Sequence, residues 1–180
     1  MARHIAFLRA INVGGHTVKM ERLRELFASL GLAAVETFVA SGNVVFESSA
    51  RQAATLERTI EIGLRDALGF DVATFIRTPA ELVAVAERQP FPASQFEGPA
   101  AFNIGFLREP IDAAAQRKLM TLRTEIDDFR VHGREIYWLC RKKQSESTFS
   151  NAVFERALGC RATFRGAATV KKMAARYGVR

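Results

Sequence analysis

Six residues in two short polar stretches have the chemistry that a site for a small anion requires. They are Arg9, Asn12, Gly14, Gly15, Ser41 and Asn43. An arginine supplies positive charge, asparagine and serine side chains supply hydrogen bonds, and glycines let a ligand approach the backbone. We therefore predict that these residues bind a small anionic or phosphorylated ligand, without established catalysis.

The stretch "INVGGHTVK", residues 11–19, does not match the known phosphate-binding loops. It is neither GxxxxGK followed by Ser or Thr, nor GxGxxG. In a second interpretation, the two adjacent glycines form only a turn between a strand and a helix, with positive φ. Thr17 then caps the helix, and Asn12 and Asn43 bond their own backbone. The sequence leaves both interpretations open.

The sequence contains no recognisable set of catalytic or metal-binding residues. The histidines have no second histidine or cysteine at a metal-ligand spacing. They are His4, His16 and His132. Ser41 lies in no GxSxG motif, and we interpret the acidic cluster at 125–128 as a solvated entry to a strand. We predict no metal and no cofactor, and the sequence does not decide whether the chain is an enzyme.

The net charge of +7 comes entirely from the C-terminal end of the chain. Residues 156–180 contain seven arginines and lysines and no acid, whereas the charges of residues 1–155 sum to zero. Such a basic end attracts nucleic acid or anionic ligands, and it is also typical of a solvated helix face. The alternative function is therefore nucleic-acid association. The residues that would hold phosphates are Arg165, Lys171, Lys172 and Arg176.

The composition is that of an ordinary globular protein, with 48% hydrophobic and 25% charged residues. No apolar run is long enough to cross a bilayer, and the N-terminus lacks a signal-peptide pattern. We therefore expect a cytoplasmic protein with no membrane contact. In a reducing compartment, Cys140 and Cys160 are expected to stay free of a disulfide.

Hydrophobic periodicity predicts the elements that position these residues. In the first half we expect strands at 3–9, 35–40, 43–47 and 72–77, helices at 19–31 and 51–68, and a short helix from Pro79. In the second half we expect strands at 101–107, 129–132, 135–140 and 162–164. Its helices begin at about Asp112 and cover 147–159 and 169–177.

The order β-α-β-β-α-β, which each half follows, is the ferredoxin-like arrangement. We predict an α+β fold of two ferredoxin-like halves with antiparallel sheets, packed together, plus a C-terminal helix. The predicted domains are 1–88 and 100–180, joined by the Pro- and Gly-rich linker 89–99. In this arrangement the glycine loop and the turn at 41–43 lie at the same end of the first sheet.

The strand at 3–9 is apolar on both faces, although its own helices cover only one face of the sheet. The second half of the chain, or a second subunit, is expected to cover the other face. A homodimeric interaction module is therefore the third predicted function.

Three segments resemble a known family, and two of them contain the six polar residues described above. They are "LRAINVGG" (8–15), "KMERLRELF" (19–27) and "SGNVVF" (41–46). With these segments the chain resembles the domain-of-unknown-function 1697 family of uncharacterised bacterial proteins. The family continues with "SN" before a helix, as in "FSNAVFERALG" (149–159), and with an "RNWNTV" segment.

The "RNWNTV" segment is only partly present, in "FRGAATVKKM" (164–173). Arg165, Thr169 and Val170 match it, but Gly166 and Ala167 replace the Asn-Trp pair. The resemblance implies that a site shaped by this segment is altered or lost in this chain. It also implies a compact cytosolic α+β protein and supplies no activity.

Overall fold

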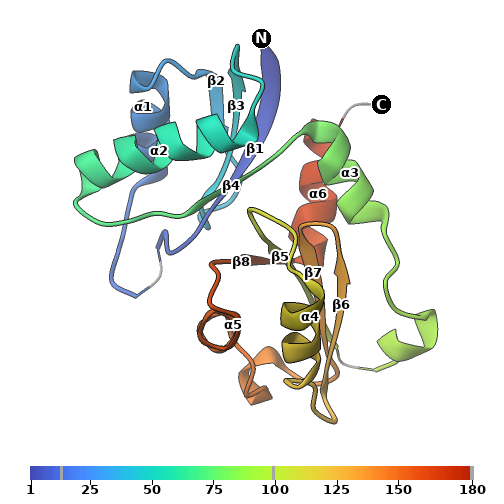
Figure 1. Cartoon of the computed structure of the whole chain (residues 1–180). Coiled ribbons are helices and arrows are strands. Elements are labelled where there is room, and N and C mark those ends of the chain that lie inside the picture. Colours follow the sequence, from blue (N-terminus) through green and yellow to red (C-terminus); the bar gives the residue numbers. More distant parts are fainter. Residues whose placement is uncertain (13, 99, 179–180) are drawn as a thin grey trace. The chain divides into compact units, whose positions relative to one another are not determined.

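The computed structural model describes residues 1–12, 14–98 and 100–178 of the chain (Figure 1). The chain divides into two compact units. Unit 1 runs from Met1 to Leu82 and includes the chain end from Tyr177, and unit 2 runs from Val83 to Arg176. The division falls within helix α3 (Pro79–Glu87). Separate domains at 1–88 and 100–180, joined by a linker at 89–99, stay a prediction.

Unit 1 is a four-stranded antiparallel sheet with two helices. Its strands are β1 (Ala2–Leu8), β2 (Ala33–Thr37), β3 (Asn43–Ser48) and β4 (Thr74–Arg77), and their order across the sheet is β2-β3-β1-β4. Its helices are α1 (Met20–Ser29) and α2 (Ala53–Leu68). This is the strand order of a ferredoxin-like unit, in which the first and third strands are central.

Unit 2 repeats the same arrangement. Its strands are β5 (Ala101–Phe106), β6 (Asp127–His132), β7 (Glu135–Cys140) and β8 (Thr163–Gly166), in the order β6-β7-β5-β8. Its further helices are η1 (Ala93–Phe96), α4 (Ala113–Met120), η2 (Gln144–Glu146), α5 (Asn151–Leu158) and the C-terminal α6 (Ala167–Tyr177). The predicted α+β fold of two βαββαβ halves and a C-terminal helix is confirmed.

The core of unit 1 follows from two amphipathic helices. Leu23, Leu26 and Phe27 of α1 recur at a helical spacing and are buried. With the buried stripe of α2 they pack on one face of the sheet, against residues such as Phe46 and Ile76. Both faces of β1 are buried from Ile5 to Leu8. What covers its second face stays a prediction, as does the homodimer.

The predicted second strand, 35–40, is wrong at its end, because β2 stops at Thr37. Val39 has a φ of 49°, in the left-handed region. A β-branched residue rarely adopts this conformation, and here it ends the extended backbone. The register between β2 and β3 also shifts between Ala33 and Glu36.

The predicted solvated position of the acidic cluster is wrong for Asp127 and Asp128, which are 0% and 2% exposed. In the core of unit 2, Asp127 Oδ1 accepts a hydrogen bond from Trp138 Nε1 at 2.8 Å. Its Oδ2 accepts from Ser147 Oγ at 2.7 Å and from Thr124 Oγ1 at 3.1 Å. Buried carboxylates are tolerated when they are hydrogen-bonded in this way, so Asp127 is a structural group of the core.

Replacing Asp127 with alanine is expected to lower the free energy of unfolding by about 2–4 kcal/mol, because it leaves Trp138 and Ser147 without their acceptor. Urea unfolding measures this loss. The control is Asp112→Ala, which removes the N-cap of α4 and should cost about 1 kcal/mol. A loss no larger than the control's would contradict the structural role of Asp127.

His4 makes the stability of the fold depend on pH. It lies buried on β1 beside the ring of Phe46, and burial lowers its pKa from the ordinary value of 6.5. The unfolded chain therefore binds this proton more readily than the folded protein does. The contribution of His4 to stability is fully present above about pH 6.5 and is lost as the pH falls below it.

We expect His4→Phe to reduce the pH dependence of the free energy of unfolding between about pH 7 and pH 5. Urea midpoints measured across this range test the prediction. His132 is exposed, so His132→Gln should keep the pH dependence of the unmodified protein. Equal pH dependence in His4→Phe and the unmodified protein would disprove the role of His4.

Candidate functional site

The two polar loops of unit 1 meet at one end of its sheet, as the topology predicts. We call this place the unit 1 corner, formed by residues 8–12, 14–19 and 38–43. Asn12 Nδ2 donates a hydrogen bond to the carbonyl of Ala40 at 2.9 Å, and the backbone N–H of Leu8 donates to Gly42 at 2.8 Å. Gly42 packs closely, since a Cβ there would lie 3.1 Å from the Cβ of Ile11. The two loops therefore form a single structural corner.

The asparagines of the corner hold the loops in place. Asn12 Oδ1 accepts a hydrogen bond from the backbone N–H of Val18 at 2.8 Å. Asn43 is buried, and its Nδ2 donates to the carbonyl of Phe38 and to Ser41 Oγ, both at 2.9 Å. These bonds favour the interpretation in which the asparagines stabilise the loops. Asn12 differs from that prediction in one respect, because it also bonds the backbone of the other loop.

The two adjacent glycines of the corner, Gly14 and Gly15, are exposed and left-handed. Gly14 has a φ of 63° and Gly15 a φ of 87°. A Cβ at either position would have nothing within 4 Å, so conformation and not crowding explains the two glycines. Their backbone is therefore open to approach from solvent. Val13, which precedes them, lies outside the described residues.

The predicted Thr17 cap of the first helix is wrong. Helix α1 has Lys19 at its N-cap position, and no described side chain caps it. Arg9 is half-buried, and its backbone N–H donates to the carbonyl of Ala73 at 2.9 Å. The ring of His16 stacks on Phe70 at 4.0 Å. Anion binding at the corner therefore stays a prediction.

The four basic residues of the predicted nucleic-acid surface do not share one environment. Arg165 is 9% exposed and donates from Nη1 to Thr163 Oγ1 at 2.7 Å and to the carbonyl of Phe164 at 3.0 Å. Burial lowers its pKa to about 10, so it stays charged at neutral pH. Lys171, Lys172 and Arg176 are exposed on α6. Nucleic-acid association stays a prediction that rests on these three.

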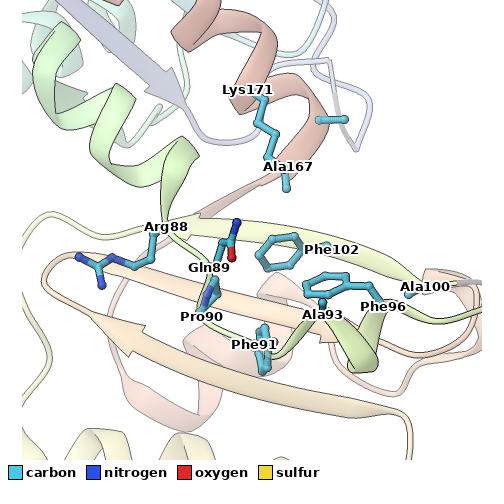
Figure 2. Close-up of a pocket in the computed structure, with 11 residues that line it drawn as sticks. Arg88, Gln89, Pro90, Phe91, Ala93, Phe96, Ala100, Phe102, Ala167 and Lys171 are labelled. Atoms are coloured by element: carbon cyan, nitrogen blue, oxygen red, sulfur yellow. The ribbon is translucent and has the colours of Figure 1, made fainter.

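Unit 2 contains a pocket of about 500 Å³ that the sequence did not reveal, which we call the unit 2 pocket (Figure 2). Its apolar wall consists of Phe91, Phe96 and Phe102, and its charged residues are Arg88 and Lys171. The three rings contact one another edge-on, with centroid distances of 5.3–6.4 Å. Figure 2 shows these rings on one side of the hollow and α6 on the other.

The segment 88–96, which we call the strap, forms most of the apolar wall. It is held against the sheet by two arginines. The guanidinium of Arg130 lies 4.9 Å from the ring centroid of Phe91, and Arg141 Nη2 donates to Gln95 Oε1 at 3.2 Å. The strap lies in the stretch that the sequence predicts as a linker. Three phenylalanines between positions 91 and 102 are the sequence signal that could have indicated this apolar wall.

The segment that resembles "RNWNTV" only in part contributes to this pocket. Ala167, the residue that replaces the tryptophan of the "RNWNTV" segment, lines the hollow together with Ala168.

The thiols offer no activated nucleophile. Cys140 is buried, Cys160 is half-buried, and both are free. Burial raises the pKa of each thiol, which keeps it protonated at neutral pH. Among the described residues, no group of three or more His, Cys, Asp or Glu side chains could hold a metal ion.

Comparison with known proteins identifies the family. The family model described as "Protein of unknown function (DUF1697)" matches residues 1–137. The chain belongs to the DUF1697 family. The match includes the unit 1 corner and the strap, whereas the α6 side of the unit 2 pocket lies beyond it.

A solved structure shares the fold of this DUF1697 chain. It is the conserved bacterial protein SP0830 from Streptococcus pneumoniae, with a TM-score of 0.79, 23% identity and 98% of each chain covered. This likeness shows the fold alone. A search of curated proteins finds no match. None of the helices in the described part of this chain has the length and apolar character to span a membrane.

Proposed function

We propose that this protein binds a small organic ligand in the unit 2 pocket. The observation that carries the proposal is a cavity of about 500 Å³ with a wall of three phenyl rings (Figure 2). Ligand sites are typically mostly apolar hollows of roughly 300–1,000 Å³ with a few polar groups. No carboxylate, thiol or imidazole is among the described residues that line it. The proposal is therefore binding, not catalysis.

The apolar wall favours binding because its three rings already pack against one another without a ligand. Phe91 is buried and fixed by Arg130, and Phe102 lies on strand β5. Phe96 is 37% exposed, so part of its ring contacts solvent. Covering such apolar surface contributes about 25 cal/mol per Å². A preformed wall also reduces the ordering cost of binding.

We expect N-phenyl-1-naphthylamine, a neutral fluorescent probe, to bind this pocket with saturable fluorescence enhancement at one site per chain. Ala167→Trp should abolish the enhancement, because the indole ring occupies the cavity that Ala167 now lines. Fluorescence titration measures both results. The matched control is Ala114→Trp, which places the same side chain at an exposed position of α4 and should leave binding unchanged.

Thermal unfolding verifies that each variant is folded. Ala168→Phe, at an exposed position on the same side of the pocket, tests the same claim if Ala167→Trp proves unstable. Absence of saturable binding, or equal binding in the filled variants and the control, would reject the pocket as a ligand site.

A second candidate function is the binding of a small anionic or phosphorylated ligand at the unit 1 corner, the loop between β1 and α1. The exposed backbone of Gly14 and Gly15, followed by a helix start without a side-chain cap, supports it. Arg9 and Lys19 would add positive charge. Asn12, Ser41 and Asn43 would contribute mainly by fixing the loops.

For this corner we expect millimolar inorganic phosphate to raise the melting temperature, since a ligand at 100 times its Kd adds about 2.7 kcal/mol. Lys19→Gln should reduce the shift, and Lys118→Gln, at an exposed position of α4, should not. Differential scanning fluorimetry measures the shifts. An unchanged melting temperature at all phosphate concentrations would exclude the corner.

A further inference from the structure

We infer that the ligand of the unit 2 pocket is a planar aromatic anion, whose ring lies against the phenyl wall and whose charge is held by Lys171. This inference rests on the proposed function of the same pocket and adds the chemical class of the ligand. It commits to a small molecule with one to three rings and a carboxylate, sulfonate or phosphate group.

The charges around the pocket have one sign. Both charged residues among its described lining, Arg88 and Lys171, are cations, and both are exposed (Figure 2). Glu87 and Glu97 flank the strap in sequence, but neither lines the cavity. Ala167 and Ala168 are the first residues of α6, so the positive end of the helix dipole faces the same hollow. An anionic group is therefore favoured over a neutral or cationic one.

The other charged side chains of α6 are also positive. The chain has no acid after Glu155, and the helix carries Lys172 and Arg176 in addition to Lys171. Of these three cations, Lys171 is the one that lines the pocket. A local contact by Lys171 can therefore be distinguished from the general field of the helix by comparing it with Lys172.

The geometry of the phenyl wall favours a flat ring. The planes of Phe96 and Phe102 meet at 67°, with their centroids 5.3 Å apart. The plane of Phe91 lies at 75° to Phe96 and 83° to Phe102. A planar aromatic ligand can stack on one of these rings while it contacts another edge-on, which are the two arrangements that aromatic pairs prefer.

The volume of the pocket limits the size of this ligand. About 500 Å³ accommodates a ligand of one to three rings, and a polymer could place only one residue there. The same observations thus favour a free aromatic anion over a nucleic acid that lies along α6.

Two probes that differ by a single charged group test the inference. 1-Anilinonaphthalene-8-sulfonate has the rings of N-phenyl-1-naphthylamine plus a sulfonate. We expect the sulfonate probe to bind roughly fivefold more tightly at low salt, and Lys171→Gln to remove most of this difference. The affinity of the neutral probe should change much less in Lys171→Gln than the affinity of the sulfonate probe.

Lys172→Gln is the matched control, because it removes an exposed cation from the same helix without touching the pocket. It should leave the affinity of both probes unchanged. Equal affinities of the two probes would overturn the inference and leave the proposed pocket intact. Equal losses in Lys171→Gln and Lys172→Gln would overturn it as well, because the helix field would then explain the preference. Failure of both probes to bind would overturn the pocket itself.

Discussion

The carboxylate of Asp128 is the group on which the pocket of unit 2 depends. Only 2% exposed, it pairs with Arg123 Nε at 2.8 Å, Arg130 Nη1 at 3.0 Å and Arg141 Nη2 at 3.9 Å. A buried carboxylate without such partners is strongly unfavourable, so the ion pairs with the arginines stabilise Asp128 at its buried position. Two of them then reach the strap, Arg130 at the ring of Phe91 and Arg141 at Gln95. The apolar wall of the pocket is held through these contacts.

Strand β6 connects Asp128 and its arginines to the core of unit 2, because neighbouring residues of a strand point to opposite faces of the sheet. Asp127 bonds Trp138 in the core of unit 2, and the next residue, Asp128, bonds the arginines that hold the strap. The two carboxylates therefore fix both faces of the same sheet. Pro90 and Pro92 interrupt regular secondary structure in the strap, and its phenylalanines attach it to the sheet, which explains why it forms the wall of the pocket.

The fold could be predicted from the sequence because its signals are local. Helical spacing of apolar residues, the capping residue Asp112 and the left-handed Gly159 all act within one element. The helix predicted at 147–159 is wrong at its start, because α5 begins at Asn151 after the N-cap Ser150. The candidate site could be predicted only in part. The two loops of the unit 1 corner meet as the topology requires, but the roles of Asn12 and Asn43 depend on partners in the folded chain. The pocket combines the strap, β5 and α6, which no local pattern connects.

The central claim is that the unit 2 pocket is the ligand site, and alanine methyl groups report on it directly. Ala93, Ala100, Ala167 and Ala168 line the cavity, whereas Ala28 and Ala54 lie on the exposed surface of unit 1. In a methyl NMR titration of alanine-labelled protein with N-phenyl-1-naphthylamine, we predict saturable shifts of the four pocket methyls and none at Ala28 or Ala54. Shifts confined to unit 1, or shifts spread equally over all alanines, would contradict the account.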